Sequence, residues 1–422
     1  MTGRDEPMRF TLAVHGTRGD VEPCAAVGRE LLRRGHEVRM AAPPNLIDFV
    51  ESAGVPGVVA YGPDSQKQLE ADFFREFWKI QNPVTLVRKG MEYITEGWAE
   101  MSATLVALSE GTDLILTGTT YQEVVANVAE YQGIPLAALH YFPARVNSSA
   151  VPIPAPPPLI RSIWASIEWL HWRMMKEAED EQRRELGLPA ATVRCARRIV
   201  EGGALEIQAY DRLFFPGLSE EWDGTRPFVG ALTMELPTST DDDVASWIAR
   251  GKPPIYFGFG SMPVESPSEA VARISEVCAK LGERALVSSG VWDLDDTAHG
   301  DHVKLVGAVN HAAVFPACRA VVHHGGAGTT AAGMRAGVPT LVLWVGADQP
   351  VWANQVKRLE VGISRRFSST NQDRLLADLR TVLAPRFTAR AREVATQLTK
   401  PGASVETAAD LLEEKAGVMA AK

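Results

Sequence analysis

Residues 320–330 read Ala-Val-Val-His-His-Gly-Gly-Ala-Gly-Thr-Thr, and this stretch predicts both the fold and the kind of ligand. Two valines end a short apolar strand, three glycines follow within four positions, and Thr329 opens a helix. A glycine-rich turn between a strand and a helix forms an anion site, because unpaired backbone N–H groups and the positive end of the helix dipole converge there. His323 or His324 can add a charge-assisted donor. The stretch therefore predicts a cradle for a diphosphate.

The same turn also fits a dinucleotide site. Gly326-Ala-Gly328-Thr-Thr-Ala331 matches the G-x-G-x-x-A fingerprint, and Asp348 follows about twenty residues later, where an acidic partner of a ribose is expected. Two features favour the diphosphate cradle: a histidine pair leads the turn, and the turn comes after at least two other strands of its domain. His323 is equally well explained as a core histidine that closes the strand.

Composition limits the possible functions. The chain has 422 residues, 45% of them hydrophobic, which is enough for two domains with cores, and a net charge of −9 argues against non-specific nucleic-acid binding. Its four cysteines have no CxxC spacing, so neither a disulfide framework nor a zinc site is predicted. No apolar run approaches 18 residues and no signal peptide is visible. We expect a cytoplasmic protein, with peripheral contact to the inner membrane face left open.

The beginning of the chain predicts a βαβ unit. A buried strand over residues 9–14 leads through a glycine-containing loop to a helix over residues 21–34, with Pro23 in its first turn, and then to a strand over residues 37–42. Ligands of such sheets bind at the carboxyl ends of the strands. The residues of the loop that should face a crevice are Thr17, Arg18, Gly19 and Asp20.

The rest of the chain predicts two domains of this α/β type. We expect a first domain over residues 1–215, a turn-rich acidic linker over 216–243 and a second domain over 244–422. Further strands are predicted at 57–61, 114–118, 136–141, 205–210, 254–259, 284–288, 303–306, 320–323, 340–344 and 362–366. Ser266-Pro-Ser-Glu269 is a capping box that predicts a helix to about residue 281.

Two long helical insertions lie in the first domain, over residues 66–108 and 159–185. The second begins with apolar residues at helical spacing and ends in a densely charged half, 176–184, which we expect to be solvated. The apolar stripe fits core packing. Because Trp164, Trp169 and Trp172 exceed what one buried face needs, it also fits an acceptor wall or a membrane-facing patch.

Three motifs, in order and spacing, resemble the signature of family 1 glycosyltransferases with the GT-B fold. They are His15-Gly-Thr-Arg-Gly-Asp-Val-Glu-Pro23, Gly258-Phe-Gly-Ser261, and the stretch from Val322 through Arg335-Ala-Gly-Val-Pro-Thr340 to Asp348-Gln-Pro350. The similarity covers nearly the whole chain. It is greatest to actinobacterial enzymes that decorate glycopeptide antibiotics and mycobacterial glycopeptidolipids. The resemblance implies two Rossmann-like doubly wound domains that face a cleft, with the last helix crossing back to the first domain.

The resemblance also implies residue roles. Asp20 would be the base that activates the acceptor hydroxyl; the alternative is that it caps the following helix. Donor binding falls to Thr17, Arg18, Gly19, Ser261, Val309, His324, Gly326, Gly328, Thr329, Asp348 and Gln349. The nucleobase-stacking tryptophan of plant relatives is absent, with Gly307 near its place, which leaves uridine or thymidine open. Acceptor contacts would come from Trp78, Tyr121, His140 and Trp164.

These features together predict an inverting glycosyltransferase that needs no metal and no cofactor. The resemblance to glycopeptidolipid enzymes implies a dTDP-linked 6-deoxyhexose such as rhamnose as donor, with UDP-glucose second, and a large, partly apolar lipidic or peptidic hydroxyl compound as acceptor. His299 and His302, near several aspartates, are interpreted as a solvated loop. Two alternatives remain: an NAD(P)-dependent oxidoreductase that uses the Gly326–Ala331 turn, and a catalytically silent nucleotide-binding homologue.

Overall fold

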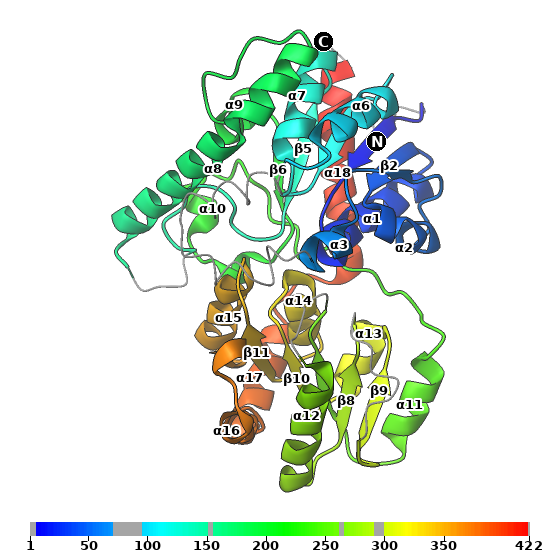
Figure 1. Ribbon diagram of the computed structural model, residues 1–422, viewed down its shortest axis with the longest axis vertical. Coiled ribbons are helices and arrows are strands. Elements are labelled where there is room, and N and C mark those ends of the chain that lie inside the picture. The colour runs from blue at the N-terminus through cyan, green and yellow to red at the C-terminus, as the bar shows by residue number, and fades with distance from the viewer. Residues whose placement is uncertain (1–5, 71–94, 151–154, 261–265, 291–298, 421–422) are drawn as a thin grey trace. The chain divides into compact units, whose positions relative to one another are not determined.

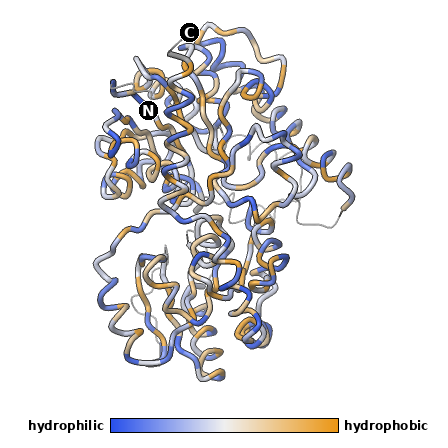
Figure 2. Tube along the Cα trace, turned by 180° about the vertical axis from the view of Figure 1, so that it is seen from behind, coloured by the Kyte–Doolittle hydropathy of each residue, from blue (hydrophilic) through white to orange (hydrophobic). Residues whose placement is uncertain are grey.

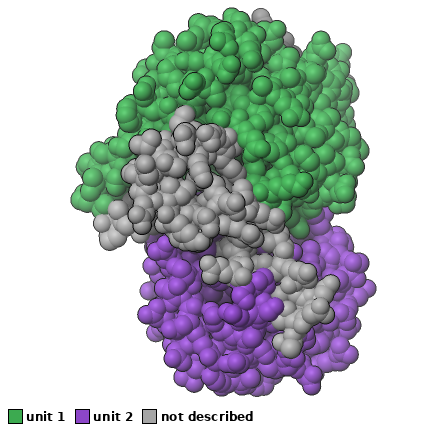
Figure 3. Space-filling model, in the orientation of Figure 1, with its two compact units in different colours: residues 1–234, 401–422 green, residues 235–400 purple. Residues whose placement is uncertain are grey.

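The computed structural model describes residues 6–70, 95–150, 155–260, 266–290 and 299–420. The chain divides into two compact units, shown in Figure 3. Unit 1 comprises Met1–Met234 and Pro401–Lys422, and unit 2 comprises Glu235–Lys400. The boundary lies within the segment predicted as a linker, and the C-terminal helix belongs to unit 1.

Unit 1 contains a six-stranded parallel sheet in the order β3-β2-β1-β4-β5-β6. Its strands are β1 (Arg9–Ala13), β2 (Glu37–Ala42), β3 (Val59–Ala60), β4 (Leu114–Thr117), β5 (Leu136–His140) and β6 (Leu205–Gln208). Its helices are α1 (Arg18–Arg33), η1 (Pro44–Leu46), α2 (Ile47–Ser52), α3 (Ser65–Glu70), α6 (Trp98–Leu108), α7 (Gln122–Gln132), α8 (Pro157–Glu185), α9 (Cys195–Glu201), η3 (Arg212–Phe214), α10 (Leu218–Glu221) and α18 (Pro401–Ala420).

Unit 2 repeats this architecture, with a six-stranded parallel sheet in the order β12-β11-β10-β7-β8-β9. Its strands are β7 (Ile255–Gly258), β8 (Ala285–Ser288), β9 (Val303–Val306), β10 (Ala320–His323), β11 (Thr340–Trp344) and β12 (Gly362–Arg366). Its helices are α11 (Asp241–Ala249), α12 (Pro267–Leu281), α13 (His311–Val314), η4 (Phe315–Ala317), α14 (Ala327–Arg335), α15 (Gln349–Arg358), η5 (Phe367–Ser369), α16 (Gln372–Val382) and α17 (Pro385–Ala395).

Each sheet has a point where the strand order reverses. In unit 1 the chain builds outward from β1 and then returns to place β4 on its other side, and in unit 2 the strands β7 and β10 have the same relation. The loops after these strands diverge to opposite faces of the sheet and leave a crevice, which is where doubly wound sheets bind ligands. Ligand sites are therefore expected at two places: the carboxyl ends of β1 and β4, and those of β7 and β10.

Side chains that alternate along the strands bury both faces of each sheet. Ile255 and Phe257 of β7 pack in the core beside α12 and α16, whereas Tyr256 between them packs in the core beside α11 and α13. All three are at most 2% exposed. In unit 1 the C-terminal helix α18 runs beside α1 (Figure 1). Arg34 fastens it through ion pairs with Asp410 and Glu413, which lie 2.6 and 3.1 Å away.

The sequence-based strands match the structure to within two residues at most ends, and the capping-box helix is confirmed at Pro267–Leu281. One prediction needs correction. Helix α1 begins at Arg18, three residues earlier than expected, so Pro23 is the sixth helical residue and lies beyond the first turn. Most of the first helical insertion, residues 71–94, lies outside the described residues. None of the described helices is both long enough and apolar enough to cross a membrane.

Helix α8 reverses the burial that its sequence predicted. Its charged second half is not simply solvated: Glu179, Gln182 and Arg183 are at most 3% exposed. Gln182 accepts a bond from the Trp98 indole at 2.9 Å, and Arg183 donates to the Asn127 side chain at 2.9 Å. Paired polar groups can be buried where apolar periodicity would not suggest it, because their hydrogen bonds replace those to water. The apolar first half is the more exposed one.

Candidate active site

In unit 2, the strand pair at the reversal point brings two loops together. β7 and β10 are parallel neighbours, with Gly258 opposite His323. Two residues after Gly258 comes Gly260 in one loop, and directly after His323 comes His324 in the other. A Cβ atom on Gly260 would lie 2.9 Å from the His324 ring, and Gly260 has a left-handed φ of +60°. Glycine thus allows the imidazole to pack directly over the neighbouring backbone.

The turn after β10 is held by a histidine. Gly325 has φ +97°, and its N–H donates to His323 Nδ1 at 2.9 Å. A Cβ atom there would lie only 2.8 Å from a Val342 methyl group, so residue 325 must be glycine both for its φ and for space. His323 is fully buried, and burial holds its pKa well below the usual range. Its role is therefore structural, as the core-histidine interpretation proposed.

Helix α14 begins without a side-chain cap. Its N-cap residue is Gly326, and the first N–H groups of a helix have no intrahelical partner. The Gly326 carbonyl is occupied, because Thr330 donates to it from its N–H at 3.0 Å and its hydroxyl at 2.8 Å. Gly328, in contrast, borders open space: a Cβ atom there would meet no atom within 4 Å. With Thr329 partly exposed beside it, this helix end offers donors and room for an anion.

His324 differs from the sequence-based expectation in its charge. Burial lowers its pKa to about 4, opposed in part by the Gly258 backbone, so the ring is neutral at pH 7. It is therefore not a charge-assisted donor in the unliganded protein. Its Nδ1 is buried and makes no hydrogen bond to a described residue, and a Cβ atom on Gly326 would lie 2.7 Å from Nε2. An anion bound here would favour the protonated ring.

Asp348 and Gln349 lie at the start of α15, of which Asp348 is the N-cap residue. The Asp348 carboxylate does not bond the backbone N–H groups of the helix; instead it accepts the Trp352 indole N–H at 3.1 Å. Gln349 Oε1 accepts the N–H of Val345 at 2.8 Å and that of Gly346 at 3.3 Å. Burial raises the pKa of Asp348 to about 6. The helix-cap alternative thus holds for position but not for hydrogen bonding.

Two other residues predicted to bind the sugar donor, Val309 and Ser261, contribute little to the description of the site. Val309 is 7% exposed and packs in the core around Phe315, so only its backbone is a plausible ligand contact. Ser261 lies outside the described residues.

In unit 1, the reversal point carries an acidic loop instead of a glycine-rich one. Asp20 is the third residue of α1, and its Oδ2 accepts the Thr17 N–H at 2.8 Å and the Thr17 hydroxyl at 3.1 Å. Gly16, with φ +135°, makes room for this carboxylate, since a Cβ atom there would lie 2.4 Å from Oδ2. The Tyr141 hydroxyl donates to the Asp20 backbone carbonyl at 2.8 Å. Asp20 is therefore not the N-cap residue, which is Thr17, but its partner in a capping box, and these bonds hold the carboxylate in one orientation.

The neighbours of Asp20 do not form a second anion site. Arg18 is exposed, pairs with Glu22 at 3.0 Å and stacks over the Phe49 ring. Gly19 is exposed on the first turn. Because Asp20 already caps the helix, the N-terminus of α1 carries a negative charge where α14 carries none.

The residues predicted to contact an acceptor have different surroundings. His140 is fully buried in a network with Gln122 and Gln208, so its side chain is not available to an acceptor. Tyr121 is 7% exposed and adopts a left-handed φ of +57°. Trp164 is half-buried, and its indole donates to the Ala150 carbonyl at 3.2 Å. Trp78 lies outside the described residues.

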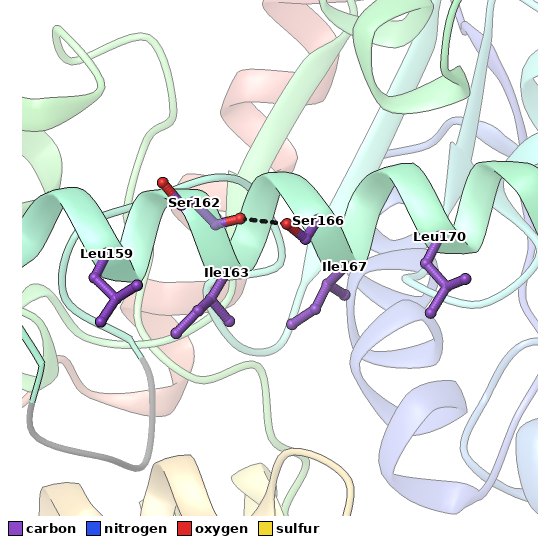
Figure 4. Close-up of a pocket in the computed structure, with 6 residues that line it drawn as sticks. All are labelled: Leu159, Ser162, Ile163, Ser166, Ile167 and Leu170. Carbon is purple, nitrogen blue, oxygen red and sulfur yellow. Dashed lines mark hydrogen bonds between the residues drawn. The ribbon is translucent and has the colours of Figure 1, made fainter.

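An apolar face runs along the first half of α8. Figure 4 shows Leu159, Ile163, Ile167 and Leu170 projecting from the same side of the helix, with Ser162 and Ser166 beside them. Leu159, Ile167 and Leu170 are each about half exposed, at 52%, 49% and 51%. Figure 2, seen from behind, shows hydrophobic and hydrophilic residues alternating along α8. Exposed apolar surface of this kind is a candidate binding face.

Sequence reasoning missed Trp352, Tyr141 and Gly16. Trp352 stands four residues after Asp348, a spacing that places both on one side of a helix and could have indicated the contact. The partnership of Tyr141 with Asp20 crosses 121 residues and had no local signal. Within the described parts of the chain, His, Cys, Asp and Glu side chains form no cluster that could hold a metal ion.

Comparison with known proteins identifies the family. A model of the glycosyltransferase family 28 N-terminal domain matches residues 10–148, and a model of the erythromycin biosynthesis protein CIII-like C-terminal domain matches residues 274–414. These matches confirm the predicted resemblance to glycosyltransferases of the GT-B fold.

Similar chains match over almost their whole length. The uncharacterized glycosyltransferase Rv1524 of Mycobacterium tuberculosis is 62% identical over 411 residues, covering 97% of this chain and 99% of that one. The vancomycin aglycone glucosyltransferase of Amycolatopsis orientalis is 32% identical over 414 residues, covering 94% and 96%. The solved structure of glycosyltransferase VinC in complex with dTDP superposes with a TM-score of 0.68 at 18% identity, covering 97% and 100%, which shows the shared GT-B fold. These matches do not support the oxidoreductase alternative. The chain belongs to the GT-B glycosyltransferases that use nucleotide sugars and is related to the enzymes of antibiotic glycosylation.

Proposed function

We propose that the protein is an inverting glycosyltransferase that transfers a hexose from a dTDP- or UDP-sugar to a hydroxyl of a large, partly apolar acceptor. The observation that carries the donor assignment is the uncapped start of α14. Its glycine N-cap, the open space at Gly328 and the buried His324 Nδ1, which bonds no described residue, form a site suited to an anion. A nucleoside diphosphate supplies that charge.

The chemistry would be a single displacement assisted by Asp20. Its carboxylate would take the proton of the acceptor hydroxyl while the hydroxyl oxygen attacks the anomeric carbon, and the bond from that carbon to the diphosphate oxygen breaks. One displacement inverts the anomeric configuration, and no covalent sugar–enzyme bond is needed. The negative charge that develops on the leaving diphosphate would be met by the N–H groups of Gly326 and Gly328 and by Thr329. Thr17, Arg18 and Ser261 are further proposed phosphate contacts.

Preorganised donors and the neutral His324 give this site a way to neutralise a leaving group without a metal ion. As the leaving group gains charge, the pKa of the buried imidazole rises and a proton can be held between ring and phosphate. Asp348 and Gln349 are proposed to bind hydroxyls of the donor sugar, and the backbone at Val309 to bind the nucleobase. Thymidine diphosphate in the structural neighbour VinC supports a dTDP-linked donor such as a 6-deoxyhexose; UDP-glucose is the second choice.

The exposed apolar face of α8 supports a partly apolar acceptor. This face, with two serine hydroxyls beside it, suits contact with an aliphatic or aromatic part of a lipidic or peptidic compound. A relative whose name records a glycopeptide aglycone supports a large acceptor. We place the reaction in the cytoplasm, with the same face of α8 able to contact the inner membrane surface.

The experiment that tests the donor site is calorimetric titration with UDP, dTDP, NAD and NADP, using wild type and His324→Ala. We expect UDP or dTDP to bind the wild type and His324→Ala to bind it at least about tenfold more weakly, since a charge-assisted contact to phosphate is lost. The tighter nucleotide identifies the donor base. Binding of NAD or NADP alone would contradict the proposal. Nucleotide binding without turnover on any hydroxyl acceptor would favour the catalytically silent homologue.

A further inference from the structure

The first turn of α15 holds the two proposed sugar-binding side chains by contacts that the proposed function does not use. The Trp352 indole N–H donates to Asp348 Oδ2 at 3.1 Å. Gln349 Oε1 is occupied by the N–H groups of Val345 and Gly346. The amide nitrogen of Gln349 bonds no described residue, so it is the end of this side chain that remains for a ligand.

Trp352 is well suited to hold its partner still. It is 1% exposed, one of the largest fully buried side chains among the described residues, so its ring cannot change rotamer without disturbing the core. Its four-residue separation from Asp348 places both on the same side of the helix. The residue before Asp348, Ala347, adopts a left-handed φ of +54°, which costs an alanine free energy and turns the chain sharply into the helix.

A carboxylate that is to accept hydrogen bonds from sugar hydroxyls must keep its charge and its direction. Burial works against the charge, since it raises the pKa of Asp348 to about 6, and no charged side chain is among the causes. Two hydrogen bonds oppose this rise, first that of the Asp348 backbone and then that of the Trp352 indole. A donor at this position therefore favours the ionised form and fixes which oxygen points away from the core.

We propose that Trp352 is a positioning residue for donor-sugar recognition, acting through the Asp348 carboxylate. This inference rests on the proposed role of Asp348 as a ligand of the donor sugar. The indole N–H, and not only the bulk of the ring, would hold the Asp348 carboxylate in the orientation that binds the sugar. Trp352 itself is buried and would not touch the sugar.

The test compares Trp352→Phe, which keeps an aromatic ring and removes the N–H donor, with wild type. The ligands are UDP and dTDP, and the matching sugar nucleotides UDP-glucose and dTDP-glucose. We expect the Kd of the sugar nucleotide to rise about five- to tenfold, whereas the Kd of the nucleoside diphosphate stays within twofold. The pH at which sugar-nucleotide binding is half-lost should move upward, because the pKa of Asp348 rises without its donor.

Trp247→Phe is the matched control. This tryptophan lies in α11 of the same unit, where the Arg284 guanidinium stacks 3.6 Å from its ring centroid, and its replacement should leave both Kd values unchanged. A second test combines Trp352→Phe with Asp348→Asn. If the indole acts through the carboxylate, the Trp352→Phe replacement should weaken sugar-nucleotide binding by less than twofold in the Asp348→Asn background. A remote packing effect would not show this departure from additivity.

Three outcomes overturn the inference. They are an equal loss of UDP and UDP-glucose affinity in Trp352→Phe, no loss of either, or full additivity with Asp348→Asn. Failure of the proposed function has a different signature, since wild type would then bind neither nucleoside diphosphates nor their sugars.

Discussion

The loops after β1 and after β10 each border the reversal point of a six-stranded sheet, although the counterpart of β1 in unit 2 is β7, and they lead into helix starts of opposite character. Helix α1 is capped from within, because Asp20 accepts the Thr17 N–H and brings its own negative charge. Helix α14 starts at a glycine and has no side-chain cap. The fold supplies a positive helix end twice, and the sequence neutralises one and leaves the other for a ligand. A doubly wound sheet therefore does not determine by itself where an anion binds.

The largest effect expected from breaking this asymmetry is on catalysis. Asp20→Asn keeps the shape of the cap but loses the base, so we expect turnover to fall about 10²- to 10⁴-fold, with the Kd for UDP or dTDP unchanged. Release of nucleoside diphosphate, measured with the hydroxyl acceptor that gives the fastest wild-type rate, checks this. Asp48→Asn, an exposed carboxylate of the same unit, is the control. A variant with more than a tenth of wild-type turnover would mean that Asp20 only caps the helix.

The next prediction separates two glycines of the other loop. Gly325→Ala should destabilise the protein by about 1–3 kcal/mol, since alanine at φ +97° is strained and its Cβ would collide with Val342. Gly328→Ala should leave the free energy of unfolding unchanged or raise it by up to about 1 kcal/mol, because alanine is the better helix former. It should nevertheless weaken nucleotide binding, since the methyl group enters the open space. Urea titration and calorimetry measure the two effects; undiminished binding by Gly328→Ala would place the phosphates elsewhere.

The third prediction concerns the loss of stability of the protein at acidic pH. The pKa of His324 is lowered to about 4 in the folded protein, below its usual 6.5, so the unfolded chain binds the extra proton first. This histidine therefore contributes stability that is complete above about pH 6.5 and is lost as the pH falls towards 4. His324→Gln should show a shallower loss of stability than wild type in that interval. The free energy of unfolding of both proteins is measured by denaturant titration at pH 7 and pH 4.5. If both lose the same amount between these pH values, the ring is not buried as described.

The smallest effect is expected at the anchor of the acidic loop. Tyr141→Phe removes the hydroxyl that donates to the Asp20 carbonyl and should cost about 1 kcal/mol of stability and a few-fold in turnover. Nucleotide affinity should not change, because Tyr141 contacts the Asp20 backbone and is not among the residues proposed to bind the nucleotide. Thermal unfolding and turnover assays suffice, and a change in nucleotide Kd would contradict the separation of roles.

Local sequence determined the elements and much of the candidate site. Ser266 begins its helix where the capping box predicts, and the strand of residues 320–323 and its glycine turn have the expected form, because hydrophobic periodicity, caps and glycine φ preferences act over a few residues. The start of α1 was misplaced, because Asp20 and Thr17 form a reciprocal cap that was interpreted from Asp20 alone. The charged half of α8 was misplaced because its partners come from other helices.

The sequence by itself thus determined two doubly wound domains, the glycine-rich turn after β10 and a carboxylate close after β1. Only the tertiary structure decided the charge of His324, the burial of His140, the exposure of the apolar face of α8, and the anchoring of Asp20 by Tyr141. Each of these depends on which distant segments surround a side chain, because burial and hydrogen bonding set its pKa and accessibility. A linear pattern of residues carries no direct record of those surroundings.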